Sequence, residues 1–329
     1  MERVLVTGAG GFIGSHLVDH LLARGAYVTA IDVAGPLPPR LSHAEGTRGL
    51  DYRQINVTDE ACVDLVAAGG FDTVFHLASV VGVARYVQNP LATIDTIVAG
   101  TRNVIRGAQI SGPRVVFTST SEVYGRNPAV PWREDAERVL GPTTVDRWVY
   151  STAKALCEHM LFAASRMDPG FPVVVVRYFN VYGPRQGPDF VVSEMIKNVL
   201  AGNPPPVFDT GTQTRCFTYI DDAIKGTLLA GESSRAVGEV INIGSSRETR
   251  IAEVAELILR LASVDGELRP RSINAQEHYG SYEDIVRRVP DVSKAKKLLG
   301  WEAETPIEVG LQRTIAESRE SMRRTLGLR

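Results

Sequence analysis

The start of the chain carries the feature that most constrains the fold. The sequence at positions 4–14 is VLVTGAGGFIG, which has the pattern of a buried strand, a glycine turn and the opening of a helix. Gly8, Gly11 and Gly14 leave room for a pyrophosphate to touch the backbone. The N-terminus of the following helix adds free N–H groups and a partial positive charge. This stretch therefore predicts a dinucleotide site within a βαβ unit.

The helix and strand that follow this turn indicate which dinucleotide binds. We expect the helix over Ile13–Arg24, capped by Gly25, and a second strand over Tyr27–Ile31. Asp32 ends that strand, 18 residues after Gly14. A carboxylate there accepts hydrogen bonds from a ribose diol and repels the 2′-phosphate of NADP, so we predict NAD as the cofactor. The alternative is an Asp that only ends a strand.

Composition is that of an ordinary globular protein. Of the 329 residues, 44% are apolar and 22% are charged, and the formal net charge is −2. Lys and Arg are spread along the chain, so we expect neither nucleic acid nor a membrane as a partner. Cys62, Cys157 and Cys216 match neither a disulfide framework nor a zinc spacing, so we expect no metal. Without a charged and apolar leader before the first strand, a cytoplasmic protein is expected.

Strand and helix patterns alternate through the first half of the chain. After the first two strands, we expect further apolar strands and intervening helices over Val74–Leu77, Leu91–Gln109, Val115–Thr118, Tyr150–Arg166 and Val173–Tyr178. Buried strands that alternate with helices predict an α/β fold with a doubly wound parallel sheet of the Rossmann type. Two stretches rich in Pro, Gly and polar residues, 34–49 and 126–147, are expected to be surface loops near the carboxyl ends of strands.

The regular alternation of strands and helices ends at about Pro184. Helices are expected over Phe190–Leu200, Asp222–Leu229, Ile251–Leu261 and Pro306–Glu320, with short strands over Pro206–Phe208 and Glu239–Ile243. We therefore interpret residues 1–183 as the NAD-binding core. Residues 184–329 are interpreted mainly as a smaller substrate lobe, with some segments returning to the core. The charged tail over residues 321–329 is expected to be a frayed, solvated end.

Tyr150 and Lys154 stand four residues apart, on one face of an expected helix. A phenol acts as a base near neutral pH only if its pKa falls from about 10 by roughly three units, or about 4 kcal/mol. A cation about 4 Å away supplies energy of that order, and an oxidised nicotinamide adds a second positive charge. The pair therefore predicts a tyrosinate base. The alternative is a surface Tyr and Lys on an amphipathic helix.

A hydroxyl-rich turn with an acid, Thr120-Ser121-Glu122, follows the strand over Val115–Thr118. Open parallel sheets bind ligands beyond the carboxyl ends of their strands, so we expect these side chains to face the same crevice as Tyr150. Thr120 would then bridge a substrate hydroxyl and the phenol. The alternative is a Ser/Thr turn that caps its own backbone.

Together these motifs resemble the extended short-chain dehydrogenase/reductases that act on nucleotide sugars. The resemblance rests on the glycine turn, HLAS at 76–79, the turn at Thr120, the YxxxK pair and RYFNVYGPR at 177–185. It implies a tightly held NAD and transient oxidation of a sugar hydroxyl, usually at C4. In this family Tyr150 would be the base and Lys154 its partner and a ligand of the nicotinamide ribose. Thr120 would be a hydrogen-bonding relay.

The resemblance also implies contacts for the two ligands. Those for NAD are Gly8, Gly11, Phe12, Ile13, Gly14, Asp32, Asn56, Val57, Leu77, Ala78, Ser79, Tyr150 and Lys154. Asn56 stands where the family usually has an Asp. Those for a nucleotide sugar are Ser121, Asn180, Arg185, Arg215 and Arg288. The helices at Leu91 and Tyr150 pair across a two-fold axis in this family, so a homodimer through a four-helix bundle is expected.

The residues after Thr120 bear on the reaction that follows oxidation. The 4,6-dehydratases have an Asp-Glu pair there, whereas this chain has Ser121. Glu122 and the stretches 141–150, 215–218 and 278–290 are similar to UDP-glucuronate decarboxylases. In those relatives, residues at the Glu122 and Arg288 positions lie at the reacting carbons. Arg288 is therefore the candidate C5 proton donor or carboxylate partner, the alternative being a surface pair with Glu283 or Asp284.

Three functions follow from these patterns, in order of preference. The first is oxidative decarboxylation of UDP-glucuronate through a 4-keto intermediate with loss of carbon dioxide. The second is 4-epimerisation of a UDP-hexose or UDP-uronate by the same intermediate. The third is a catalytically silent NAD-binding sensor, which would not need the Thr, Tyr and Lys.

Overall fold

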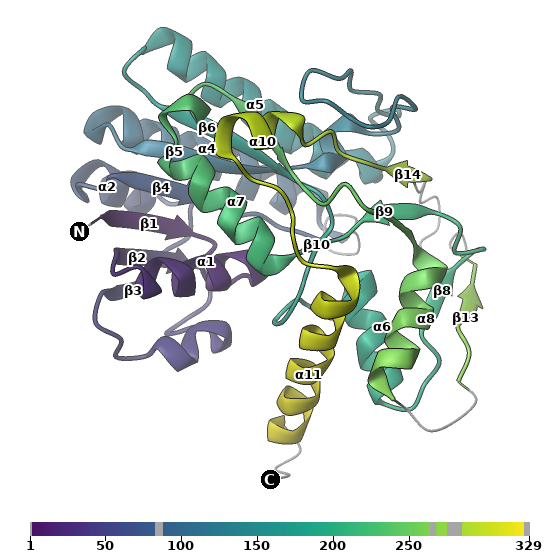
Figure 1. The fold of residues 1–329 in the computed structure, drawn as a ribbon. Coiled ribbons are helices and arrows are strands. Elements are labelled where there is room, and N and C mark those ends of the chain that lie inside the picture. The colour runs from purple at the N-terminus through teal and green to yellow at the C-terminus, as the bar shows by residue number, and fades with distance from the viewer. Residues whose placement is uncertain (1, 83–87, 264–267, 275–284, 326–329) are drawn as a thin grey trace.

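A seven-stranded parallel sheet forms the centre of the computed structural model, which describes residues 2–82, 88–263, 268–274 and 285–325 (Figure 1). The strand order is β11-β6-β5-β4-β1-β2-β3, and all neighbours pair in parallel. Its strands are β1 Arg3–Thr7, β2 Tyr27–Asp32, β3 Leu50–Gln54, β4 Thr73–His76, β5 Arg114–Thr120, β6 Val173–Tyr178 and β11 Val240–Ile243. The prediction of a doubly wound parallel sheet is confirmed.

Helices cover both faces of this sheet (Figure 1). The helices α1 Phe12–Ala23 and α7 Ile220–Glu232 pack on one face, where Val4 and Val6 point. The other face, where Leu5 points, is covered by α2 Glu60–Ala68, α4 Pro90–Ser111 and α5 Val149–Met167. Because successive strand side chains point to opposite faces, a strand buried on both sides is apolar throughout.

Two segments from the second half of the chain complete the core. The strand expected over Glu239–Ile243 is β11, which pairs with β6 at the edge of the main sheet, and α7 packs against β5, β6 and β11. The sequence patterns missed β3 and α2. Three of the five residues of β3 are polar and exposed, because this strand is an edge of the sheet, and α2 has only nine residues.

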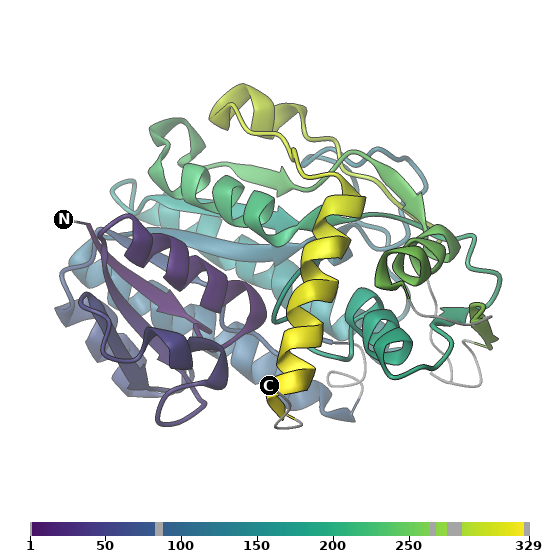
Figure 2. The same ribbon diagram turned by 60° about the horizontal axis from the view of Figure 1, so that its bottom comes forward.

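The smaller lobe lies beyond the carboxyl ends of the strands (Figure 1). Its helices are α6 Val191–Leu200, α8 Ile251–Ala262 and α11 Ile307–Thr325, and its sheets pair β8 Pro206–Phe208 with β13 Arg271–Ile273 and β9 Thr214–Cys216 with β12 Glu248–Arg250 and β14 Arg287–Arg288. In Figure 2, α11 lies at the front, and it packs against α6 and α8. This helix extends five residues further than expected, to Thr325, so the predicted frayed start of the tail is wrong.

Short elements connect these parts. They are β7 Val181–Tyr182 paired with β10 Thr218–Tyr219, α10 Ser293–Leu299, and the 3-10 helices η1 Pro39–Ala44, η2 Ser121–Tyr124, η3 Asp146–Trp148 and η4 Ser234–Ala236. The stretch 126–147 is irregular, but it is no simple surface loop. Its Trp132 is fully buried and stacks on Tyr124, and Arg147 is 2% exposed.

Membrane-spanning and metal-binding features were sought over the part of the chain that the structure describes. None of its helices combines the length and apolar character needed to cross a bilayer. The same residues contain no group of three or more side chains arranged to hold a metal ion. All three cysteines are buried and free.

Candidate active site

The glycine turn between β1 and α1 has the geometry that a dinucleotide needs. Gly8 has a φ of +69°, and a Cβ there would lie 2.8 Å from the backbone of Ala78. A Cβ on Gly14 would lie 2.2 Å from the carbonyl oxygen of Gly8. The N-cap of α1 is Gly11, and no side chain caps this end. The first N–H groups of α1, beside Phe12 and Ile13, therefore suit a pyrophosphate, so the residues present fit NAD.

The other residues expected at NAD follow the neighbouring strands β2, β3 and β4. Asp32 ends β2, where its carboxylate accepts hydrogen bonds from the N–H groups of Gly10, at 2.9 Å, and Ala34, at 3.2 Å. Beyond β4, Thr7 accepts from the N–H groups of Leu77 and Ala78. This contact fixes the path of the chain beside the glycine turn.

Asn56 and Val57 lie after β3. The Asn56 side chain accepts a hydrogen bond from the N–H of Thr58 at 3.1 Å. Val57 is buried, and its side chain would lie 2.6 Å from a Cβ at Gly100 of α4. The Asn56 side chain therefore shapes this turn by accepting from the backbone two residues further on.

Tyr150 lies in the first turn of α5, with its phenol close to the hydroxyls of Thr120 and Ser79. Thr120 also accepts from the N–H of Glu122 at 3.2 Å, so both roles considered for this hydroxyl are present. Burial, together with the negative charge of Glu122, raises the pKa of Tyr150. The arrangement joins a phenol, a hydroxyl and a carboxylate at the carboxyl end of β5.

Lys154 is buried one turn further along α5. Its Nζ donates to the carbonyl of Thr118 at 2.8 Å and lies 4.7 Å from the centre of the Phe117 ring. Burial lowers the pKa of Lys154 to about 8. Burial and the charge of Glu122 are the main influences on the pKa of Tyr150, and both raise it. That Lys154 favours the tyrosinate stays a prediction.

Glu122 is held between two arginines, Arg147 and Arg288, and we call these three residues the Glu122 cluster. The Arg147 Nη2 lies 2.6 Å from Oε2 of Glu122, and the Arg288 Nη1 donates to Oε1. Burial opposes the charge on Glu122, yet the two guanidinium groups lower its pKa to about 2. Arg147 and Arg288 are 2% and 6% exposed. Glu122 is therefore ionised at neutral pH.

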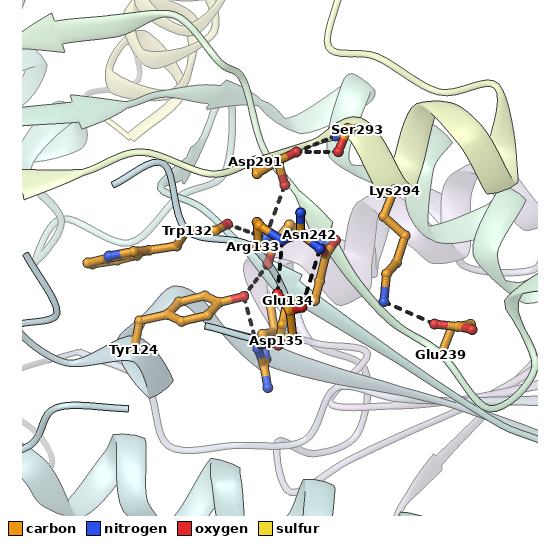
Figure 3. Close-up of polar contacts among 11 residues, drawn as sticks. Tyr124, Trp132, Arg133, Glu134, Asp135, Glu239, Asn242, Asp291, Ser293 and Lys294 are labelled. Atoms are coloured by element: carbon orange, nitrogen blue, oxygen red, sulfur yellow. Dashed lines mark hydrogen bonds and ion pairs between the residues drawn. The ribbon is translucent and has the colours of Figure 1, made fainter. Parts of the chain in front are cut away.

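Hydrogen bonds around Asn242 hold the segment that follows β14 (Figure 3). Its amide donates to the carbonyls of Trp132 and Asp291, at 2.9 and 3.1 Å. Its Oδ1 accepts from the hydroxyl of Tyr124 at 2.7 Å. Tyr124 ends η2, and Asp291 lies three residues after Arg288. This brace therefore fixes the two segments that carry Glu122 and Arg288 relative to each other.

The remaining residues expected at the substrate are spread more widely. Ser121 is buried beside Glu122, and Arg215 of β9 is buried and donates to the carbonyl of Thr214 at 2.7 Å. Asn180 has a φ of +37°, and its Oδ1 is buried with no hydrogen-bond partner among the described residues. Arg185 instead pairs with Asp19 of α1 at 2.5 Å.

Arg147 was missed among the expected site residues. Its signal was its place three residues before Tyr150, inside a stretch already found similar to decarboxylases. The surface pairs considered for Arg288 involve Glu283 and Asp284, which lie outside the described residues, as does the stretch 275–284. Arg288 itself is buried against Glu122, which the sequence did not predict.

Known proteins resemble this chain over almost its whole length. A model of the NAD dependent epimerase/dehydratase family matches residues 4–244. The chain is 37% identical to UDP-N-acetyl-alpha-D-glucosaminuronate decarboxylase of Bacillus cytotoxicus over 322 residues, 97% of this chain and 98% of the relative. It is 34% identical to UDP-glucuronic acid decarboxylase 1 of Xenopus tropicalis over 324 residues, 98% of this chain and 73% of the relative.

A solved structure has the same fold. It is UDP-glucuronic acid 4-epimerase from Bacillus cereus in complex with UDP-glucuronic acid and NAD, with a TM-score of 0.86 and 28% identity. The likeness covers 97% of this chain and 99% of that chain.

Proposed function

The chain belongs to the NAD dependent epimerase/dehydratase family, and from this premise we propose that it is an NAD-dependent oxidative decarboxylase of a UDP-linked uronate, most simply UDP-glucuronate. The observation that carries the proposal is the Glu122 cluster beside Tyr150. A uronate brings a carboxylate into the site, and guanidinium groups recognise carboxylates through charge and a planar set of donors. Two decarboxylases of such uronates among the relatives support the same assignment.

NAD would lie across the carboxyl ends of β1, β2 and β4. Its pyrophosphate would be held by the glycine turn and the start of α1, and its adenosine ribose by Asp32. Asn56 and Val57 would flank the adenine, Leu77, Ala78 and Ser79 would line the path to the nicotinamide, and Lys154 would hold the nicotinamide ribose. The chemistry that NAD supplies when bound is the acceptance of a hydride from the sugar C4 and its later return.

Tyr150 is the proposed base for the first step. It takes the proton of the C4 hydroxyl, with Thr120 as the relay between that hydroxyl and the phenol. Lys154, whose pKa is about 8, carries its proton at neutral pH and so keeps a positive charge one turn away from the phenol. The product of this step is a ketone at C4, which makes the uronate a β-keto acid.

The β-keto acid can then lose its carboxylate, because the ketone accepts the electrons of the broken bond. The bond between C5 and the carboxylate breaks, carbon dioxide leaves, and the electron pair moves to the ketone as an enolate. The enolate takes a proton from water at C5, and the C4 ketone is reduced as Tyr150 returns its proton and the hydride would return from NAD. Glu122, with a pKa of about 2, does not supply the C5 proton at neutral pH. We assign Arg288 as the partner of the substrate carboxylate.

The smaller lobe, mainly residues 184–329, is proposed to bind the nucleotide sugar. Ser121 and Asn180 would face the sugar, and the unsatisfied Oδ1 of Asn180 supports a contact with a ligand donor. Arg215 and Arg185 would act toward the diphosphate; Arg185 would first have to leave Asp19.

A 4-epimerase is the second candidate. The likeness to the Bacillus cereus structure favours it, because that enzyme is a UDP-glucuronic acid 4-epimerase of the same fold. Both reactions need the same first step at C4. They differ in whether the ketone loses the carboxylate or turns over and is reduced on its other face.

The deciding experiment incubates the pure protein with NAD and UDP-glucuronate and follows the products by proton NMR. A UDP-pentose and carbon dioxide are expected. UDP-galacturonate without carbon dioxide would make the protein a 4-epimerase instead. A parallel sample with the 2-acetamido uronate named for the Bacillus cytotoxicus relative tests the choice of sugar.

A homodimer in the cytoplasm completes the proposal. The helices α4 and α5 pack side by side and expose Leu91, Ile94 and Leu156, which suits a four-helix bundle across a two-fold axis. Three buried free cysteines suit a reducing compartment.

A further inference from the structure

Arg147 connects the base helix to the Glu122 cluster. It lies in η3, directly before α5, so only two residues separate it from Tyr150. Its guanidinium carbon lies 5.4 Å from the centre of the Trp148 ring, and Trp148 is itself buried. Gly141 packs closely on that ring, because a Cβ there would lie 2.2 Å from Nε1 of Trp148. The position of the Arg147 guanidinium is therefore set by buried packing.

The two arginines divide the oxygens of Glu122 between them. Arg147 takes Oε2 and Arg288 takes Oε1. A carboxylate bound at one oxygen only is free to turn about its last bond, whereas one bound at both oxygens is fixed. Glu122 thus fixes the direction of Arg288, and Arg147 fixes Glu122. The three residues come from η3, η2 and β14, so their relative positions depend on contacts between separate segments.

We propose that Arg147 is a positioning residue for decarboxylation: through Glu122 it sets the orientation in which Arg288 meets the substrate carboxylate. This inference rests on the proposed function, which assigns the substrate carboxylate to Arg288. The two halves of the reaction therefore depend on different residues. Oxidation at C4 depends on Tyr150 and Lys154, while loss of the C5 carboxylate depends on the chain of contacts from Arg147 to Arg288.

The test is a double-mutant cycle with two readouts. Arg147→Gln, Glu122→Gln and the double variant are given UDP-glucuronate carrying a labelled carboxylate, in the presence of NAD. Single-turnover absorbance of reduced NAD reports oxidation at C4, and released labelled carbon dioxide reports decarboxylation. Arg147→Lys, which keeps the charge but lacks the planar fork, serves if the Gln variant does not fold.

The matched control is Arg177→Lys. Arg177 forms a buried ion pair with Glu158 at 2.6 Å, both side chains being 8% exposed. Its other hydrogen bonds go to the hydroxyl of Tyr124 and the carbonyl of Glu134, and not to the Glu122 cluster. Its replacement is expected to lower stability and, where activity falls, to lower oxidation and decarboxylation together. This control separates the loss of a buried ion pair from the loss of orientation.

We expect Arg147→Gln to slow carbon dioxide release by about 100-fold while oxidation changes by less than about threefold, so that reduced NAD accumulates. The double variant should be no slower than Glu122→Gln, because Arg147 acts through that carboxylate. Equal losses in both readouts, or a double variant slowed by the product of the single effects, would overturn the inference. A wild-type protein that releases no carbon dioxide would instead overturn the proposed function, and this inference with it.

Discussion

The phenol of Tyr150 lies where its ionisation is opposed. Burial and the carboxylate of Glu122 both raise its pKa, and Lys154 directs its ammonium to the carbonyl of Thr118. Arg147 and Arg288 pair with Glu122 and offset its negative charge. In the proposed mechanism, the positive charge of bound oxidised NAD would favour the tyrosinate, which would couple activation of the base to NAD binding.

Replacing Tyr150 by Phe removes only the phenol oxygen and so tests the proposed role of Tyr150 as the base. The ring keeps its packing, so NAD should still bind, while turnover of UDP-glucuronate should fall by roughly 100- to 10,000-fold, the usual contribution of a general base. Product NMR gives the turnover, and calorimetric titration with NAD gives the binding.

The control for that variant is Tyr182→Phe. It removes another buried phenol, which donates to the carbonyl of Ile307 at 3.2 Å. It is expected to reduce stability and to leave turnover within a few-fold of the wild type. Normal turnover in Tyr150→Phe would remove the base assignment.

At the scale of elements, the buried strands were predicted more accurately from the sequence than the exposed ones. The strands over residues 173–178 and 206–208 have the predicted limits, because short, mainly apolar runs between turn residues leave few alternatives. The edge strand β3 was missed because its exposed residues carry no such pattern. In the proposed site, Tyr150 and Lys154 were predicted from their spacing along one helix that follows a dinucleotide-binding pattern. The pairing of Arg147 with Glu122 joins η3 to η2, and a contact between separate segments has no signature in a single sequence.

The end of β4 carries a buried histidine with a consequence for acid stability. His76 lies between the hydroxyls of Thr7, at 2.8 Å, and Thr101, at 3.1 Å, and so ties β1 to α4. Burial, with a further contribution from the charge of Lys154, lowers the pKa of His76 to about 3. As the pH falls below about 6.5, the unfolded chain takes up a proton that the folded ring refuses, so stability falls with pH.

We expect this ring to account for about 2 kcal/mol of the stability lost between pH 7 and pH 5. The free energy of unfolding is measured by urea titration at pH 7 and at pH 5 for the wild type and for His76→Gln. The decrease between the two pH values should be about 2 kcal/mol smaller in the variant, whatever stability the variant loses at pH 7. His43→Gln, which removes an exposed imidazole, is the control. An unchanged pH dependence in His76→Gln would show that another group governs the acid response.

At the scale of the whole molecule, the sheet and the smaller lobe meet at the proposed site. Strand β9 of the lobe pairs with β14, which brings Arg288 to the turn after β5. Asn242 of β11 then ties the segment beyond β14 to the core. A residue near the end of the chain thereby meets one from its first half. Sequence patterns predicted the two parts, while their register against each other depends on these long-range contacts.

The exposed face of α4 and α5 is the proposed dimer interface. Leu91, Ile94 and Leu156 are 72%, 37% and 47% exposed there, a cost in free energy that a second copy would remove. Light scattering after gel filtration should give twice the mass of one chain, and Ile94→Glu combined with Leu156→Glu should give a monomer, because unpaired carboxylates resist burial. Val237→Glu, at an exposed valine outside both helices, should remain a dimer. A monomeric wild type would exclude this interface, and a dimeric double variant would move it elsewhere.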